Sequence, residues 1–260
     1  MNGAGYVPRW LVVPAAAGLL FLLVPLVALV TRVQPDTFWA DVTSDAARSA
    51  LLLSLGTGAA ATVVCAVLGI PLALLIARSS PRTAAFLRAV VTVPLVLPPM
   101  VGGVALLYLF GRNGWFGGLG LPFTTAAVVL AQVFVALPFL VLAVEGALRS
   151  TGVEVERTAA SLGASRVTIL RRVTLPLAAP GIVAGVVLCF ARAIGEFGAT
   201  ALFAGNRPGV TQTMPLAIYT AFNGGGVAQG TAVALALLLL VTAIAVLLLV
   251  RGWRPAVGAP

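Results

Sequence analysis

The stretch SALLLSLGTGAAATVVCAVLGIPLALLIA, residues 49–77, carries no charged side chain and is longer than a helix needs to cross a membrane. About 20 consecutive apolar residues span the hydrocarbon core of a bilayer. Other uncharged stretches lie at residues 10–31, 89–111, 113–144 and 208–250. Only helices and closed barrels satisfy the backbone in hydrocarbon, and these continuous runs do not alternate as barrel strands do. The sequence therefore predicts an all-α integral membrane protein.

We expect six transmembrane helices. A fifth span contains Arg192 and Glu196 within sequence that is otherwise apolar. The first span is too long for a signal peptide and lacks a small-residue cleavage pattern, so we expect it to stay uncleaved. Residues 1–47 would hold this span and an external loop, residues 48–251 the main transmembrane domain, and residues 252–260 a cytoplasmic tail. The expected spans lie near residues 10–31, 49–77, 88–111, 123–147, 179–203 and 227–250.

Composition excludes several classes of function. Only 9% of the 260 residues are charged and 60% are apolar, whereas a soluble domain carries about 25% charged residues. The chain has 16 arginines, no lysine and no histidine, so it has neither a histidine base nor the lysine of a nucleotide-binding P-loop. The arginines are too scattered for a nucleic-acid surface, and two cysteines inside apolar runs make no disulfide framework.

The arginines concentrate on alternate loops. Eleven lie on the side of the predicted N-terminus, second loop, fourth loop and C-terminus, and four lie on the other side. The positive-inside rule then places both termini and the loop near residues 149–178 in the cytoplasm. The eleven are Arg9, Arg78, Arg82, Arg88, Arg149, Arg157, Arg166, Arg171, Arg172, Arg251 and Arg254, and the four are Arg32, Arg48, Arg112 and Arg207.

The fourth loop carries signals for two short helices. Thr151 and Glu154 have the spacing of a capping box and predict the start of the first. Gly163 should interrupt it. Ser165 can cap a second helix, which we expect to end before Pro176.

The first of these helices has one apolar face, because Val155, Ala159 and Leu162 recur at helical spacing. Such a helix could lie on the membrane surface. Ala159 and Ala160, however, offer little area to lipid and permit close approach of another protein. Both interpretations stay open on the residues alone.

At this loop the sequence resembles permease subunits of binding-protein-dependent ABC importers. Their loop reads Glu-Ala-Ala, three residues, Gly, nine residues, Ile-x-Leu-Pro, and here Gly163 precedes Val173-Thr174-Leu175-Pro176 at that spacing. Arg157 and Thr158 replace the first two residues of the pattern, and Glu156 lies one place early. The resemblance implies a coupling helix that docks on a separate ATPase through Glu156 or Arg157. The candidate coupling residues are Glu156, Arg157, Ala159, Ala160, Gly163, Ala164, Leu175 and Pro176.

Three further stretches resemble permeases for molybdate and related oxyanions. They are VPLVLPPMVGG at 93–103, ARAIGEFGAT at 191–200, and FAGN at 203–206 leading to TQTMPLAIY at 211–219. Sulfate and thiosulfate permeases have similar segments, and tungstate is a further alternative. The resemblance implies a type I transmembrane domain over 48–251 in the cytoplasmic membrane. It also implies a homodimer, two ATPase subunits that bind ATP and magnesium, an extracytoplasmic oxyanion-binding protein, and no cofactor on this chain.

Two features suggest a translocation pathway. Prolines and glycines between Pro94 and Gly103 break regular helix, and irregular backbone at membrane depth lies inside protein or beside a water-filled cavity. A kinked helix packed on its neighbours is the alternative. Arg192 and Glu196 are four residues apart and can pair, either in a gate or as a structural lock. The candidate pathway residues are Pro98, Pro99, Gly102, Gly103, Arg192, Glu196, Phe197 and Gly198.

Two other function classes fit the sequence less well. An intramembrane enzyme would need a nucleophile with a base, paired acids or a metal site, and Glu196 is isolated within its span. A proton-coupled secondary transporter could use intramembrane charges, but the two halves of the chain show no repeat. Glu145, near the end of the fourth span, should pair with Arg149 one turn on.

Overall fold

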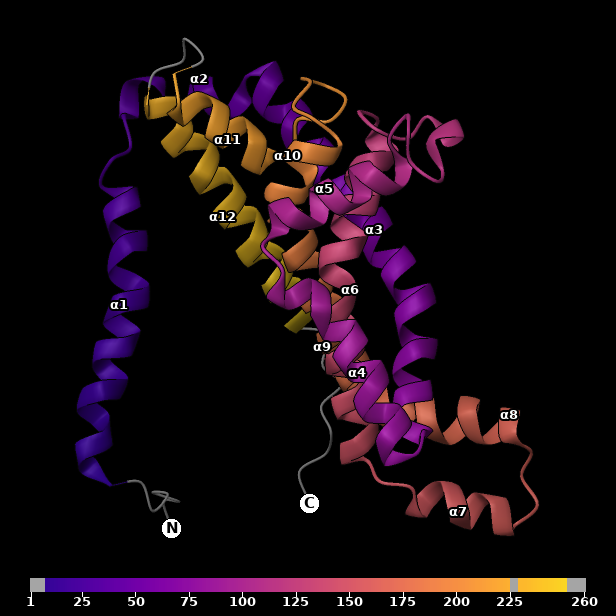
Figure 1. Ribbon diagram of the computed structural model, residues 1–260. Helices are drawn as coiled ribbons and strands as arrows, with labels where there is room; N and C mark the ends of the chain where they lie inside the picture. The colour runs from indigo at the N-terminus through magenta and orange to yellow at the C-terminus, as the bar shows by residue number, and fades with distance from the viewer. Residues whose placement is uncertain (1–7, 225–228, 252–260) are drawn as a thin grey trace.

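The computed structural model describes residues 8–224 and 229–251, and nearly all of them are helical (Figure 1). Short turns of other helix types are η1 (Arg9–Leu11), η2 (Gly117–Leu119) and the π-helical η3 (Leu170–Thr174). The α-helices are α1 (Val12–Val30), α2 (Pro35–Thr43), α3 (Asp45–Arg78), α4 (Pro81–Val96), α5 (Pro99–Phe110), α6 (Thr125–Ser150), α7 (Glu154–Ser161), α8 (Arg166–Ile169), α9 (Leu175–Ile194), α10 (Gly198–Phe203), α11 (Met214–Phe222) and α12 (Gln229–Arg251).

Four helices within the described residues are long and apolar enough to cross a membrane. They are α1, α3, α6 and the continuous helix Arg166–Ile194, which is made of α8, η3 and α9. The pair α4 and α5 passes the same test together and bends by 106° at the break between them, so it could supply a fifth span. In α12 the apolar stretch is Gly230–Val246.

The core of the bundle lies between α3, α6 and α9, and small side chains let these helices approach closely. Gly69 of α3 packs under Leu137 and Leu140 of α6. Gly185 of α9 packs against Ala143, which also belongs to α6. Interior packing of this kind fixes the spans from which the shorter helices project.

The short helices divide between the two ends of the bundle. Figure 1 shows α2, α10 and α11 at one end, whereas α7 and α8 project from the other end, where α1 begins. α1 stands to one side of the bundle, and none of its described side chains is buried.

Two predicted spans differ from the structure. The span expected at 88–111 starts at Pro81 and breaks at Leu97 and Pro98, because a proline offers no N–H to continue a helix. The span expected at 179–203 starts at Arg166 and ends at Ile194, before the separate helix α10.

The loop prediction also needs correction. Thr151 does not cap α7, because Val153 is the N-cap residue and the Thr151 hydroxyl donates to the carbonyl of Leu148. The second loop helix does not end before Pro176 but continues through it, and the π-helical turn η3 lies directly before the proline. Ser165 caps this helix as predicted. The tail predicted at 252–260 and residues 227–228 of the last predicted span lie outside the described residues.

Candidate functional site

Two breaks in helices lie against each other. One is the break between α4 and α5, and the other is the break between α9 and α10. A Cβ atom at Gly198 would lie 3.1 Å from Pro99 Cβ, and one at Gly103 would lie 2.8 Å from the carbonyl oxygen of Ala199. Real Cβ atoms essentially never approach as closely as the second distance, so the contact requires glycine there.

The predicted pathway residues mostly meet at this junction. Gly102 and Gly103 are buried in α5, and Gly102 faces the ring of Phe134 in α6. Pro98 and Pro99 are exposed at the start of α5. Phe197 instead turns toward α11, where its ring centroid lies 4.9 Å from that of Tyr219.

Glu196 bridges the break between α9 and α10. Its Oε2 forms a salt bridge with Arg192, 2.7 Å from Nη2, and its Oε1 accepts a hydrogen bond of 2.8 Å from the backbone N–H of Ala199. The Glu196 side chain is 1% exposed and the Arg192 side chain 24% exposed. Arg192 also lies 6.0 Å from the ring centroid of Phe139. The spacing of four residues predicted the ion pair, but the backbone contact depends on a helix break that spacing alone does not reveal.

A buried amide, which the apolar pattern of the sequence did not reveal, also lies in α6. Gln132 is 0% exposed, and neither its Oε1 nor its Nε2 has a hydrogen-bond partner among the residues that the structure describes. Thr200 of α10 is equally buried, and its hydroxyl is also unpaired. The sequence signal that could have revealed this buried polar group is Gln132 itself, a single amide side chain in an otherwise mostly apolar helix.

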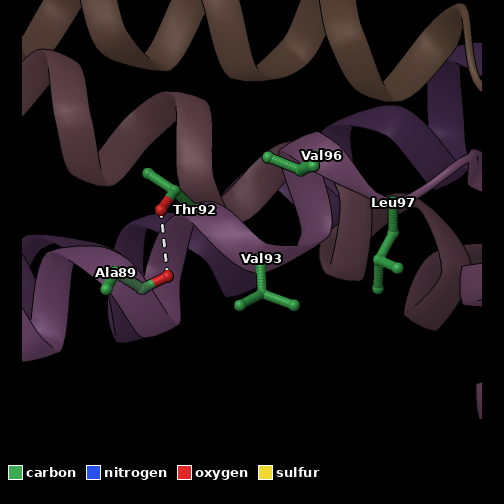
Figure 2. A pocket seen from close by; sticks show the side chains of 5 residues that line it. All are labelled: Ala89, Thr92, Val93, Val96 and Leu97. Atoms are coloured by element: carbon green, nitrogen blue, oxygen red, sulfur yellow. Dashed lines mark hydrogen bonds between the residues drawn. The ribbon is translucent and has the colours of Figure 1, made fainter.

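An open groove of about 320 Å³ follows one face of α4 (Figure 2). In Figure 2, Val93 and Leu97 point to the same side, and Thr92 donates a hydrogen bond to the carbonyl of Ala89. The groove reaches the break after α4, but none of its lining side chains is charged. It therefore offers an apolar wall and no binding group for an anion.

At the opposite end from α10, Glu156 of α7 contacts two other elements. Its Oε1 accepts hydrogen bonds from Nη2 of Arg78 (2.5 Å) and from the hydroxyl of Thr174 (2.8 Å). Partial burial acts to raise the pKa of Glu156, but these two hydrogen bonds and the Arg78 charge outweigh it and hold the pKa below its usual value. The carboxylate is therefore ionised at neutral pH.

Other predicted coupling residues are spread over α7 and the turns after it. Arg157 has 72% of its side chain exposed, and among the described residues it pairs only with Glu154 of the same helix. Ala159 and Ala164 are half-buried, and Ala160 is exposed. Gly163 has φ of +83°, a left-handed conformation that favours glycine. Leu175 is half-buried and Pro176 exposed on the following helix.

Glu145 makes the predicted pair with Arg149 and a second pair that the sequence did not reveal. Its Oε1 accepts from Nε of Arg149 at 2.8 Å and from Nη2 of Arg88 at 2.6 Å. Arg88 lies in α4, so the pair ties α4 to α6 below the break. The two residues are far apart in the sequence, and only the packing brings them together.

Comparison with solved structures defines the class of fold. The chain resembles a bacterial alginate ABC transporter, crystallised with a periplasmic protein that carries an alginate pentasaccharide, with a TM-score of 0.71 and 18% identity over 94% of this chain and 91% of that chain. An inward-facing methionine ABC transporter, MetNI, gives a TM-score of 0.63 and 20% identity over 81% and 99% of the two chains. The fold is that of an ABC transporter permease.

Sequence comparison defines the family. Residues 69–257 match the family described as binding-protein-dependent transport system inner membrane component, and the chain belongs to this family. It is 52% identical to the molybdenum transport system permease protein ModB of Mycobacterium bovis over 95% of both chains. It is 39% identical to the protein of the same name from Escherichia coli over 74% of this chain and 86% of the other. The chain is therefore a multi-pass membrane component of a transport system.

Proposed function

We propose that this chain is the permease subunit of an ABC importer for molybdate. The observation that carries the proposal is the 52% identity, over 95% of both chains, to a molybdenum transport permease. Tungstate, sulfate and thiosulfate are the alternative substrates, because they are oxyanions of similar shape and charge. In this proposal the chain has six spans, with α12 as the last, and both termini in the cytoplasm.

Within this function, α7 is the coupling helix that contacts a separate ATPase. Val155 and Leu162, one full heptad apart, have exposed fractions of 51% and 83% at the end of the molecule that carries α7. A contiguous exposed apolar patch marks a protein or membrane contact surface, and we assign this one to the ATPase. On the polar side of α7, Arg157 is the coupling candidate that stays exposed, because Glu156 is turned toward the bundle.

The permease works as a homodimer with two ATPase subunits, which bind ATP and magnesium, and with an extracytoplasmic oxyanion-binding protein. One chain supplies few spans to enclose a path, and a second copy would complete it. The junction of the two helix breaks is the proposed gate. Arg192, partly exposed, is the cation that an anion would meet there, and Glu196 holds that cation in place.

Reconstitution of the permease in lipid vesicles with its ATPase and an oxyanion-binding protein tests the function. Molybdate should stimulate ATP hydrolysis and enter the vesicles. If sulfate but not molybdate stimulated hydrolysis, the substrate would be sulfate instead of molybdate. Uptake driven by a proton gradient without ATP would instead favour a secondary transporter and overturn the proposal.

The coupling assignment has its own test at Gly163. Gly163→Pro imposes φ near −65° where the chain has +83°, so α7 and α8 should change their relative direction. The variant should still insert in the membrane but lose assembly with the ATPase or stimulated hydrolysis. Normal assembly and stimulation would contradict the assignment of α7.

A further inference from the structure

Three elements meet at one carboxylate oxygen near the base of the bundle. Glu156 lies in α7, Arg78 is the last residue of α3, and Thr174 is the last residue of the π-helical turn η3. The carboxylate therefore connects the projecting helix to two membrane-spanning helices at once. Its side chain is 19% exposed, although α7 as a whole has no buried residue.

The other polar side chains of α7 form no comparable connection. Arg157 bonds Glu154, Thr158 bonds the carbonyl of Glu154, and Ser161 bonds the carbonyl of Thr158. Within residues 154–161, each recorded side-chain hydrogen bond other than those of Glu156 stays inside α7. The orientation of α7 against the bundle thus depends on Glu156 more than on any other polar group of the helix.

The π-helical turn supplies a second, independent observation. Thr174 is 6% exposed, whereas Arg171 and Arg172 of the same turn are exposed. One extra residue in a helical turn changes which side chains face inward before and after it, and such turns occur often at functional sites. Here the turn ends with the Thr174 hydroxyl directed at Glu156, so a local irregularity of the long helix coincides with the contact to α7.

We propose that Glu156 is a positioning residue that braces α7 against the ends of α3 and the Arg166–Ile194 helix. Through this brace, defined as Arg78, Glu156 and Thr174, a displacement of α7 is passed to two spans rather than absorbed by its flanking turns. The inference rests on the proposed function, because it takes α7 as the site where an ATPase acts. It assigns the two candidate residues different roles, with Arg157 on the partner side and Glu156 on the bundle side.

The decisive variant is Glu156→Gln in the full complex, with Glu154→Gln as the matched control on the same helix. Glu156→Gln should keep the ATPase subunits bound and basal ATP hydrolysis within about twofold of the unmodified complex. Hydrolysis stimulated by the loaded binding protein should fall about fivefold or more, because charged hydrogen bonds are roughly twice as strong as neutral ones. Glu154→Gln should keep its stimulation.

Exchanging the two charges distinguishes loss of this ion pair from a general loss of stability, because only the specific pair is restored in the double variant. Arg78→Glu and Glu156→Arg should each lose stimulation, and the double variant should regain at least part of it. If Glu156→Gln fails to fold, Thr174→Val removes one bond but keeps the ion pair and should show a smaller loss of stimulation. Three results would each overturn the proposed role of Glu156: unchanged stimulation in Glu156→Gln, an equal loss in Glu154→Gln, or no recovery in the double charge-exchange variant.

Hydrogen exchange of the permease alone separates this inference from the proposed function. Amides of α7 should exchange faster in Glu156→Gln than in the unmodified chain, and Glu154→Gln should leave them unchanged. Unchanged exchange in Glu156→Gln would refute the brace whatever the partner is. Faster exchange together with no ATPase binding by the unmodified chain would support the contact and refute the proposed function instead.

Discussion

Glu196→Gln removes one charge from the junction of the helix breaks and keeps the shape of the side chain. Its amide oxygen can still accept from Ala199 N–H, as Glu196 Oε1 does at 2.8 Å. Its NH2 group must then face the guanidinium of Arg192, where Glu196 Oε2 now forms a salt bridge at 2.7 Å. Two donors would meet, and Arg192 would lose its counter-charge.

The magnitude follows from burial. Removal of one partner of a buried ion pair costs about 3–5 kcal/mol. Arg192 retains 24% exposure, so solvent offsets part of this loss, and we expect about 2 kcal/mol. For a chain of this size that corresponds to a fall in melting temperature of roughly 4–8 °C. The measurement is thermal unfolding of the purified permease in detergent.

The double variant Arg192→Gln and Glu196→Gln separates stability from transport. Replacing both charged groups with neutral amides should restore most of the stability, since no buried charge stays unpaired. Molybdate uptake should nevertheless remain low if Arg192 is the cation that the anion meets. A Glu196→Gln variant that melts like the unmodified chain would refute the role of the ion pair. A double variant that is stable and transports normally would refute the gate.

Three further predictions concern the close helix contact, the topology and the effect of pH. Gly103→Ala should cost about 1–3 kcal/mol in thermal unfolding, because its Cβ would lie 2.8 Å from a backbone oxygen, whereas Gly118→Ala, with open space around it, should be close to neutral. A cysteine at Ser165 should react with an impermeant maleimide only from the cytoplasm, and one at Asn206 only from outside, and labelling of both from one side would contradict the topology. The lowered pKa of Glu156 means that the stability it contributes is present above the usual glutamic acid pKa of about 4.3 and is lost only as the pH falls through its lower folded-state value. Exchange of α7 amides, corrected for the intrinsic rate, should therefore not change between about pH 6 and 8.

The sequence predicted where long apolar helices lie and the break between Pro94 and Gly103, but not the break after Ile194. Uncharged runs located α1, α3 and α6, because apolar length is a property of the local sequence. Prolines signalled the irregular start of α5, yet neither the bend of 106° nor the close contact of α5 with α10 could be predicted from them. The π-helical turn just before Pro176 left no clear local signal in the sequence.

The same distinction applies to the candidate sites. Arg192 with Glu196 and Glu145 with Arg149 were predictable, because four residues along a helix return to the same face. Arg78 with Glu156 and Arg88 with Glu145 were not, since each pair joins different helices and depends on how those helices pack. In both cases the unpredicted partner is an arginine on the side to which the positive-inside rule assigns most arginines. An arginine whose carboxylate partner lies on another helix can therefore help to set both the orientation of the chain in the membrane and the position of a specific helix, and charge counts record only the first effect.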